Sequence, residues 1–209
     1  ALANGDDAEA YGVNSAGNAS VMNANTNADA NTTDGLAGAF GVNAENNAFV
    51  EGGTHQAMAD GANAEAYGVF TGEVAIVINA DTSASATAFD FSALAIGVSA
   101  FSNATVTGGT HQAMVTADGA NADALGVFAA ENAIVVNANT HADANATGGS
   151  AQAFGVNAGN NSNVSVGSHE AMATALGDDA EATGIFADNN VTATNASTSA
   201  IANSTDGSA

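Results

Sequence analysis

The segment Ala64-Glu-Ala-Tyr-Gly-Val69 recurs, with small changes, along the whole chain of 209 residues. The string Ala-x-Ala-x-Gly, followed by Val or Ile, begins at Ala8, Ala37, Ala64, Ala93, Ala122, Ala151 and Ala180. Counted in sequence number, the step between successive starts is 29 in every case but one, and the step from Ala37 to Ala64 is 27. Self-similarity at a fixed period of roughly 20 to 50 residues is typical of solenoids, propellers and repeat arrays.

Within each unit, apolar and polar residues alternate with a period of two, which is typical of half-buried strands. Three stretches show this alternation, exemplified by Ala64–Val69, Asn132–Asn137 and Thr140–Asn145. Clusters of Gly and Asn between them supply the positive φ angles of tight corners. The sequence therefore predicts an all-β fold, a parallel β-solenoid (β-helix or β-roll) of seven repeats.

We expect a single β-solenoid domain over residues 1–209. The repeats cover residues 5–33, 34–60, 61–89, 90–118, 119–147, 148–176 and 177–205. Even units share the sequence seen at Gly52–Met58 and Gly108–Met114, so two units together form a super-repeat of about 58 residues. The pattern allows one coil of three strands per unit or two shorter coils. One coil is favoured, because the second half of a unit does not repeat the first.

Invariant alanines identify the predicted interior: the positions of Ala64, Ala66 and Ala84 hold Ala in every unit. The residue after the second of these has the opposite parity and should point outward. It forms a predicted lateral contact stripe of Tyr11, Phe40, Tyr67, Ile96, Leu125 and Phe154. A period of two shows which residues share a face of the strand, but not which of the two faces is interior. The alternative is therefore that Tyr67 and Val69 face a second core and the Ala face is exposed.

A second position is Asn in six of the seven units. Stacked coils would place these side chains about 4.8 Å apart, where amides bond to one another along the axis. The predicted Asn ladder consists of Asn18, Asn47, Asn103, Asn132, Asn161 and Asn190.

The chain has 22 acidic residues, no Lys or Arg, and a formal net charge of −22. Nucleic-acid, phosphate and acidic-membrane surfaces are excluded, because they need basic side chains. The absence of Cys excludes disulfides and thiolate chemistry. No apolar run approaches the roughly 20 residues that cross a bilayer. We expect a secreted or cell-surface protein whose signal peptide has been removed.

The segment Gly5-Asp-Asp-Ala-Glu-Ala-Tyr-Gly12 and its counterparts resemble the Gly-x-x-Ala-x-Ala-x-Gly repeats of trimeric autotransporter adhesin heads. Those heads are parallel β-rolls on bacterial surfaces, so the resemblance implies a surface solenoid. The match covers only the first part of each unit, and the repeat period here is about twice the period of that family.

Carboxylates cluster at the starts of the first and seventh units. Carboxylate oxygens are ligands that Ca²⁺ prefers, which makes these residues candidates for a calcium site; the alternative is a solvated acidic face. The candidate ligands are Asp6, Asp7, Glu9, Asp178, Asp179 and Glu181.

Three histidines share one position in the even units, and each is followed three positions later by a methionine, as in His55 and Met58. A His/Met copper site is one interpretation. The favoured one is a corner ladder of His and Thr, because Thr holds the same position in the odd units. We expect mild acid to protonate these histidines.

The repeat leaves no local departure that joins a nucleophile to a base, so we expect no enzyme. The repeat pattern runs to both ends of the sequence without a cap, which favours head-to-tail self-assembly into an extracellular filament, sheath or biofilm fibre. Lateral bundling through the stripe is a further expectation. The alternatives are a cell-surface adhesin, a binding module or spacer, and, less favoured, an ice-binding solenoid built on Thr26, Thr82, Thr140 and Thr198.

Overall fold

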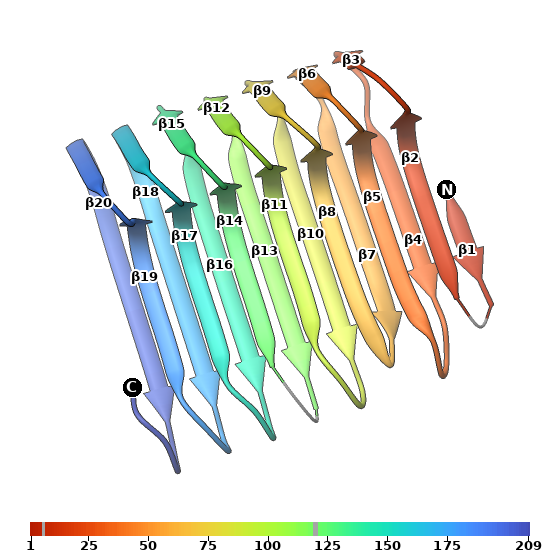
Figure 1. Ribbon diagram of the computed structural model, residues 1–209, viewed down its shortest axis with the longest axis vertical. Helices are drawn as coiled ribbons and strands as arrows, with labels where there is room; N and C mark the ends of the chain where they lie inside the picture. The colour runs from red at the N-terminus through yellow and green to blue at the C-terminus, as the bar shows by residue number, and fades with distance from the viewer. Residues whose placement is uncertain (6, 119–120) are drawn as a thin grey trace.

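The computed structural model describes residues 1–5, 7–118 and 121–209, which form strands and turns without a helix. Each strand pairs in parallel with the equivalent strand of the next unit (Figure 1). Ala93 pairs with Ala122 and Ala37 pairs with Ala64, so the strand register follows both the regular step and the shortened step of the sequence repeat. The predicted parallel β-solenoid is confirmed, with one coil of three strands per unit rather than two shorter coils.

Three sets of strands form the sides of the coil. The elbow strands make a seven-stranded sheet of β2 (Ala8–Ser15), β5 (Leu36–Ala44), β8 (Asn63–Thr71), β11 (Ala93–Ala100), β14 (Ala122–Ala129), β17 (Ala151–Ala158) and β19 (Ala180–Ala187). The short head strands are β3 (Ala19–Met22), β6 (Asn47–Glu51), β9 (Val74–Ile78), β12 (Asn103–Thr107) and β15 (Asn132–Val136). The arm strands are β1 (Leu2–Asn4), β4 (Thr26–Asn31), β7 (Thr54–Gly61), β10 (Asp81–Ala88), β13 (Thr110–Ala117) and β16 (Asn139–Ala146). In the last two coils, β18 (Asn161–Ala175) and β20 (Asn190–Ser204) run through head and arm without a break.

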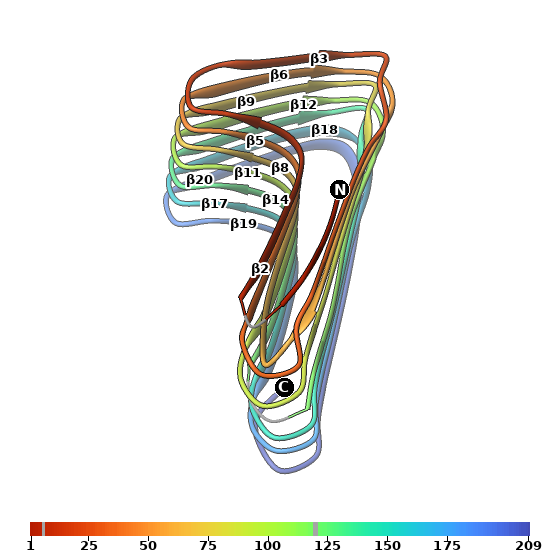
Figure 2. The same cartoon turned by 90° about the vertical axis from the view of Figure 1, so that its right-hand side faces the viewer.

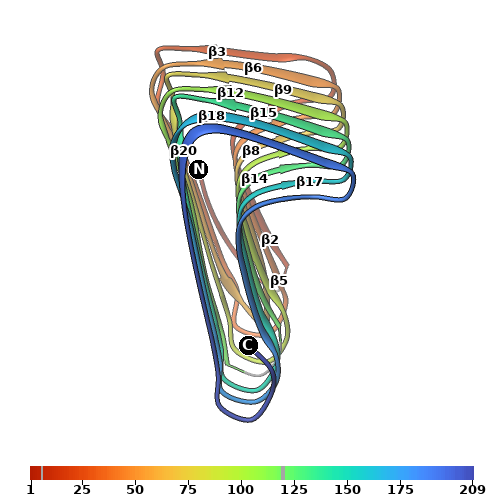
Figure 3. The same ribbon diagram turned by 90° about the vertical axis from the view of Figure 1, so that its left-hand side faces the viewer.

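Seen along its axis, the coil has a wide head above a narrow arm (Figures 2 and 3). The arm interior is lined by alanines from the elbow and arm strands, and Val115 is the one larger apolar side chain in this cluster among the described residues. The head interior adds a row of valines that includes Val98, Val106 and Val135. Because a methyl group fills only a narrow space, the alanine positions set the thinness of the arm and the valines set the width of the head.

Each elbow strand bends at its glycine, and the bend changes which face of the strand is inside. Ala124 and Val127 are both interior, while Leu125 lies on the outer side. A Cβ at Gly126 would lie 2.6 Å from the carbonyl oxygen of Gly155 and 2.7 Å from Cβ of Thr140. Glycine is required because the next coil's backbone and a side chain from the arm fill the inside of the elbow. The alternative in which Tyr67 and Val69 share one core is therefore wrong: Val69 is interior and Tyr67 is outside.

The two residues missing from the second unit are missing from a turn at the tip of the arm. There β7 ends at Gly61 and β8 begins at Asn63, whereas residues 89–92 link β10 to β11 in the next coil. The register on both sides of this turn keeps Ala37, Ala64 and Ala93 paired. A shortened turn leaves the stacking of the strands unchanged, since the turn lies outside the ladders.

The period of two coils arises from side chains that cross from each odd coil to the next even coil. Thr82 Oγ1 lies 3.0 Å from Nδ1 of His111, and the pairs Thr26–His55 and Thr140–His169 repeat this contact at 2.9 and 3.0 Å. Nε2 of His111 lies 3.2 Å from the carbonyl oxygen of Gly108. A carbonyl can only accept, so Nε2 carries the proton and Nδ1 accepts from the threonine hydroxyl. The predicted His–Thr ladder is therefore a set of buried pairs inside the elbow.

A row of Asn and Asp side chains makes the same odd-to-even connection on the surface. Asp81 Oδ1 accepts from the backbone N–H of Thr110 at 2.8 Å, and Asn139 Oδ1 accepts from that of Ser168 at 3.0 Å. In the corner before these residues, odd coils place Asn at positive φ, as at Asn79 (φ 49°), and even coils place Gly, as at Gly108 (φ 67°). A pair of coils is therefore the structural unit, which explains the larger sequence period.

The sixth coil departs from this corner pattern, because Val166 occupies the position of Gly52 and Gly108 and has φ 54°. A β-branched residue at positive φ is strained by about 1–2 kcal/mol. We expect Val166→Gly to raise the free energy of unfolding by about 1 kcal/mol, since the side chain is 46% exposed and contributes little burial. Urea unfolding followed by circular dichroism measures this change. A destabilised Val166→Gly protein would show that the corner is not strained.

Candidate functional site: an outer groove at the elbow

The lateral stripe predicted from the sequence lies on the outer side of the bend in the elbow strands. Its central members cover one another, so that Tyr67, Ile96, Leu125 and Phe154 are only 5–8% exposed. Towards the N-terminus the stripe continues as a ring stack: Tyr11 and Phe40 have centroids 5.0 Å apart, and Phe40 and Tyr67 have centroids 5.1 Å apart. The stripe is thus the floor of a groove that runs along the solenoid axis.

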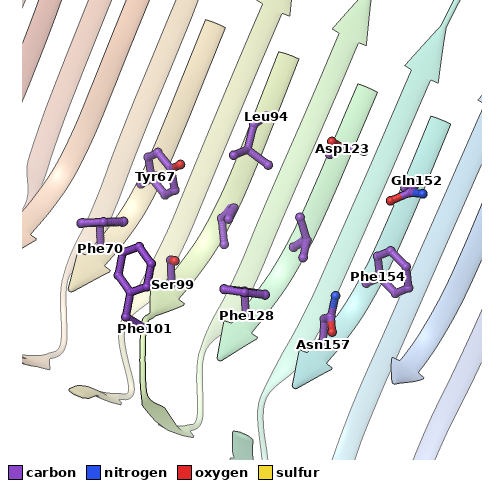
Figure 4. A pocket seen from close by; sticks show the side chains of 12 residues that line it. Tyr67, Phe70, Leu94, Ser99, Phe101, Asp123, Phe128, Gln152, Phe154 and Asn157 are labelled. Carbon is purple, nitrogen blue, oxygen red and sulfur yellow. The ribbon is translucent and has the colours of Figure 1, made fainter. Parts of the chain in front are cut away.

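The opposite wall of this groove is formed by the part of each elbow strand that turns into the head. Phe70 meets Tyr67 edge to face at 5.0 Å, and Phe101 meets Phe70 in the same way at 5.9 Å. With Phe128, these side chains enclose a cavity of about 310 Å³ (Figure 4). Sequence reasoning missed Phe70 and Phe128, because uniform alternation does not predict the change of face at the glycine bend. Their signal was an aromatic residue directly after the recurring Gly-Val step.

Carboxylates occupy the arm side of the groove in alternate coils. The outward position two residues before the stripe holds Glu9, Glu65, Asp123 and Glu181 in the odd coils, and Gly38, Leu94 and Gln152 in the even coils. The Tyr11 hydroxyl donates a hydrogen bond of 2.9 Å to Glu9. Burial raises the pKa of Asp123 above its ordinary value. Burial likewise raises the pKa of Tyr67, with a smaller contribution from nearby Glu65.

The carboxylates predicted to bind calcium are used in part to join coils. Asp7 accepts a hydrogen bond of 3.1 Å from the backbone of Leu36, and Asp179 accepts one of 2.7 Å from Ser208. Asn63 and Asn121 make the same contact in other odd coils. Asp6 lies outside the described residues. No three His, Asp or Glu side chains gather closely enough to hold a metal ion among the described residues.

The copper interpretation is wrong, because His and Met lie on opposite faces of the arm strands. His55 is fully buried, whereas Met58 is 50% exposed on the outer surface. Burial opposes the expected protonation of these histidines in mild acid. Burial lowers the pKa of His55 and His169, and lowers that of His111 to about 4.

The threonines that share this interior row are equally unavailable as a solvent-facing surface. Thr26, Thr82 and Thr140 are buried, at 8%, 1% and 2% exposure, and only Thr198 in the last coil is exposed. The row considered for ice binding is therefore an interior row in the first six coils.

The predicted Asn ladder forms along the outer corner of the head. Asn132 Nδ2 donates to Asn103 Oδ1 at 2.8 Å, and Asn161 Nδ2 donates to Asn132 Oδ1 at 2.7 Å. Asn190 continues this run at 2.9 Å, and Asn47 donates to Asn18 at 3.0 Å. Val74 interrupts the ladder between these two runs.

Few basic groups of the chain offset the negative charge of its surface carboxylates. In the described part of the chain the one contact between a carboxylate and a basic side chain joins His141 Nδ1 to Glu170 Oε2 at 3.4 Å on the outside of the arm, and it is an ion pair when His141 is protonated. The described residues also include no helix that is both long and apolar enough to pass through a membrane.

Comparison with protein-family models, with curated proteins and with solved structures finds no match to this chain.

Proposed function

We propose that the protein is a structural solenoid that assembles by adding coil upon coil, as a subunit of an extracellular filament, sheath or biofilm fibre. The observation that carries this proposal is the constant strand register, which makes the edge of each coil complementary to its neighbour. Each added coil covers the interior of the coil before it: Val164 and Ala171 pair with Ala193 and Ala200 of the next coil and are 0% and 3% exposed. Interior side chains and strand edges that repeat in this way are a template for a further coil.

Stacking of coils also stabilises each coil. It adds ladder hydrogen bonds and buries apolar surface in a chain whose alanine core contributes little of its own.

The composition supports an extracellular material. A chain with no Lys or Arg contains no cleavage site for trypsin-like proteases. Its charge of −22 opposes association at low ionic strength, so assembly should need physiological salt or a divalent cation to screen the carboxylates.

Electron microscopy of the purified protein at physiological salt, with chelator and then with added Ca²⁺, tests this proposal. We expect unbranched fibres with a layer line near about 4.8 Å, the spacing of stacked strands. Ala200→Glu should abolish the fibres, because it places a charge in the interior row that Ala171 occupies one coil earlier. Ser199→Glu adds the same charge to the neighbouring position with the opposite orientation and should leave them intact. Discrete particles of the unaltered protein in every condition would contradict assembly.

The outer groove favours a second candidate function, that of a binding module on a bacterial surface. This function agrees with the resemblance to adhesin-head repeats. A soluble monomer that binds a partner through the groove would support it over the filament.

A further inference from the structure

The outer groove is an apolar channel on the outside of the elbow strands that no segment of the described chain covers. Its floor is the stack of stripe residues, and Phe70 and Phe128 form the wall opposite. Beside the cavity of about 310 Å³, a second hollow of about 290 Å³ lies further towards the N-terminus, between Phe40, Glu9 and Glu65. The two hollows have no lining residue in common, but together they follow the stripe over several coils, which fits an elongated partner better than a compact one.

The charge along the groove has one sign and a regular spacing. Glu9, Glu65, Asp123 and Glu181 recur in every second coil, which places them about 9.6 Å apart, or two strand spacings. A second copy of this chain lying in the groove would bring further carboxylates and no Lys or Arg against this row, so it is disfavoured as the occupant. The complementary partner carries basic groups at the same spacing.

Regular peptide conformations differ in how well they match this spacing. Three residues of polyproline II rise about 9.3 Å, within about 0.3 Å of two coils. An extended strand presents every second residue at about 6.6 Å, and an α-helix returns to the same face after seven residues, at about 10.5 Å. Aromatic-lined grooves are also the surfaces on which polyproline II segments dock.

We propose that the outer groove binds a proline-rich polyproline II segment with a basic residue at every third position. The prolines lie on the floor formed by Tyr67, Ile96, Leu125 and Phe154, and each basic side chain pairs with one carboxylate. Arginine suits this role better than lysine, because its guanidinium pairs with a carboxylate through two hydrogen bonds and also stacks on aromatic rings.

Asp123 is the carboxylate that gains most from such a partner. Asp123 is one of the residues that line the central cavity (Figure 4), and its side chain accepts no hydrogen bond from the described residues. Partial burial raises the pKa of Asp123 above its ordinary value. A guanidinium group that donates hydrogen bonds to this carboxylate would favour its charged form.

The test is isothermal titration calorimetry of the full chain at physiological salt with the acetylated peptide (Pro-Pro-Arg)₄. Its four arginines match the four carboxylates in number and spacing. A peptide of eight prolines followed by four arginines has the same composition and charge without the spacing. We expect (Pro-Pro-Arg)₄ to bind at least about tenfold more tightly than this control peptide.

The matched variants are Asp123→Asn in the groove and Asp143→Asn on the outside of the arm strand β16, each of which removes one charge. We expect Asp123→Asn to weaken binding about tenfold and Asp143→Asn less than about twofold. Equal affinity for the two peptides, or equal loss in the two variants, would overturn the proposal in favour of general attraction to an acidic chain. Sedimentation equilibrium that shows a dimer strengthened by Asp123→Asn would overturn it in favour of a second copy. The assay is independent of fibre formation, so failure of one proposal leaves the other standing.

Discussion

Gly126→Ala is expected to lower the free energy of unfolding by about 3–5 kcal/mol, a large share of the stability of an ordinary domain. The added methyl group would lie 2.6 Å from the Gly155 carbonyl oxygen and 2.7 Å from Cβ of Thr140. Neither neighbour is the end of a flexible side chain that can rotate away. Relief of this clash requires the strand ladder or the elbow to move, and the ladder extends through the neighbouring coils. Urea unfolding of both proteins, followed by far-ultraviolet circular dichroism, measures the effect.

Gly38→Ala is the matched control, because Gly38 belongs to an elbow strand but faces outward. A Cβ there would lie 3.5 Å from a ring carbon of Phe40 and 3.7 Å from Cγ of Glu9, which are ordinary contacts. We expect a change of no more than about 0.5 kcal/mol, and of stabilising sign, since alanine restricts the unfolded chain. A Gly126→Ala protein as stable as the Gly38→Ala protein would refute the packing of Thr140 inside the elbow.

The second large effect is a loss of stability in mild acid that originates in the buried histidines. Burial lowers the pKa of His111 to about 4, whereas an unfolded histidine titrates near its model value of 6.5. Below pH 6.5 the unfolded chain therefore binds more protons than the folded one. The stability contributed by neutral His111 is complete above that pH and falls until the pH reaches about 4. At pH 5 the loss is about 2 kcal/mol for this residue, and the lowered pKa values of His55 and His169 act in the same direction.

Unfolding free energies of the native chain and of His111→Gln at pH 7.5 and pH 5 test this linkage. Glutamine can still donate to Gly108 and accept from Thr82, but it does not titrate. We expect the decrease between the two pH values to be about 2 kcal/mol smaller in the variant. Neutralising carboxylates relieves repulsion in both proteins, so this opposing effect cancels in the comparison. His141→Gln removes a histidine from the surface of the arm and leaves the buried row intact, so it is the control. An identical decrease in all three proteins would exclude a role for the buried row.

The repeat and its alternation determined most of the fold without reference to any tertiary contact. The repeat length is constant, and side chains alternate with a period of two along each strand. Together these features force parallel stacking, because only that arrangement places each Ala or Asn beside its equivalent in the next coil. Invariant Ala positions are interior because any larger side chain would separate the two sides of the arm. The outward stripe followed from the same parity. All of these features are local or strictly periodic, and a sequence records both directly.

The tertiary structure decided what happens where the period of two is interrupted. The glycine bend changes the inner face between Ala124 and Val127, and this change creates the groove wall at Phe128. Which odd-coil side chain meets which even-coil group depended on contacts between successive coils, such as Thr82 with His111. Sequence alternation gives the side of a strand on which a residue lies, but only the path of the backbone through a bend determines which side is the interior.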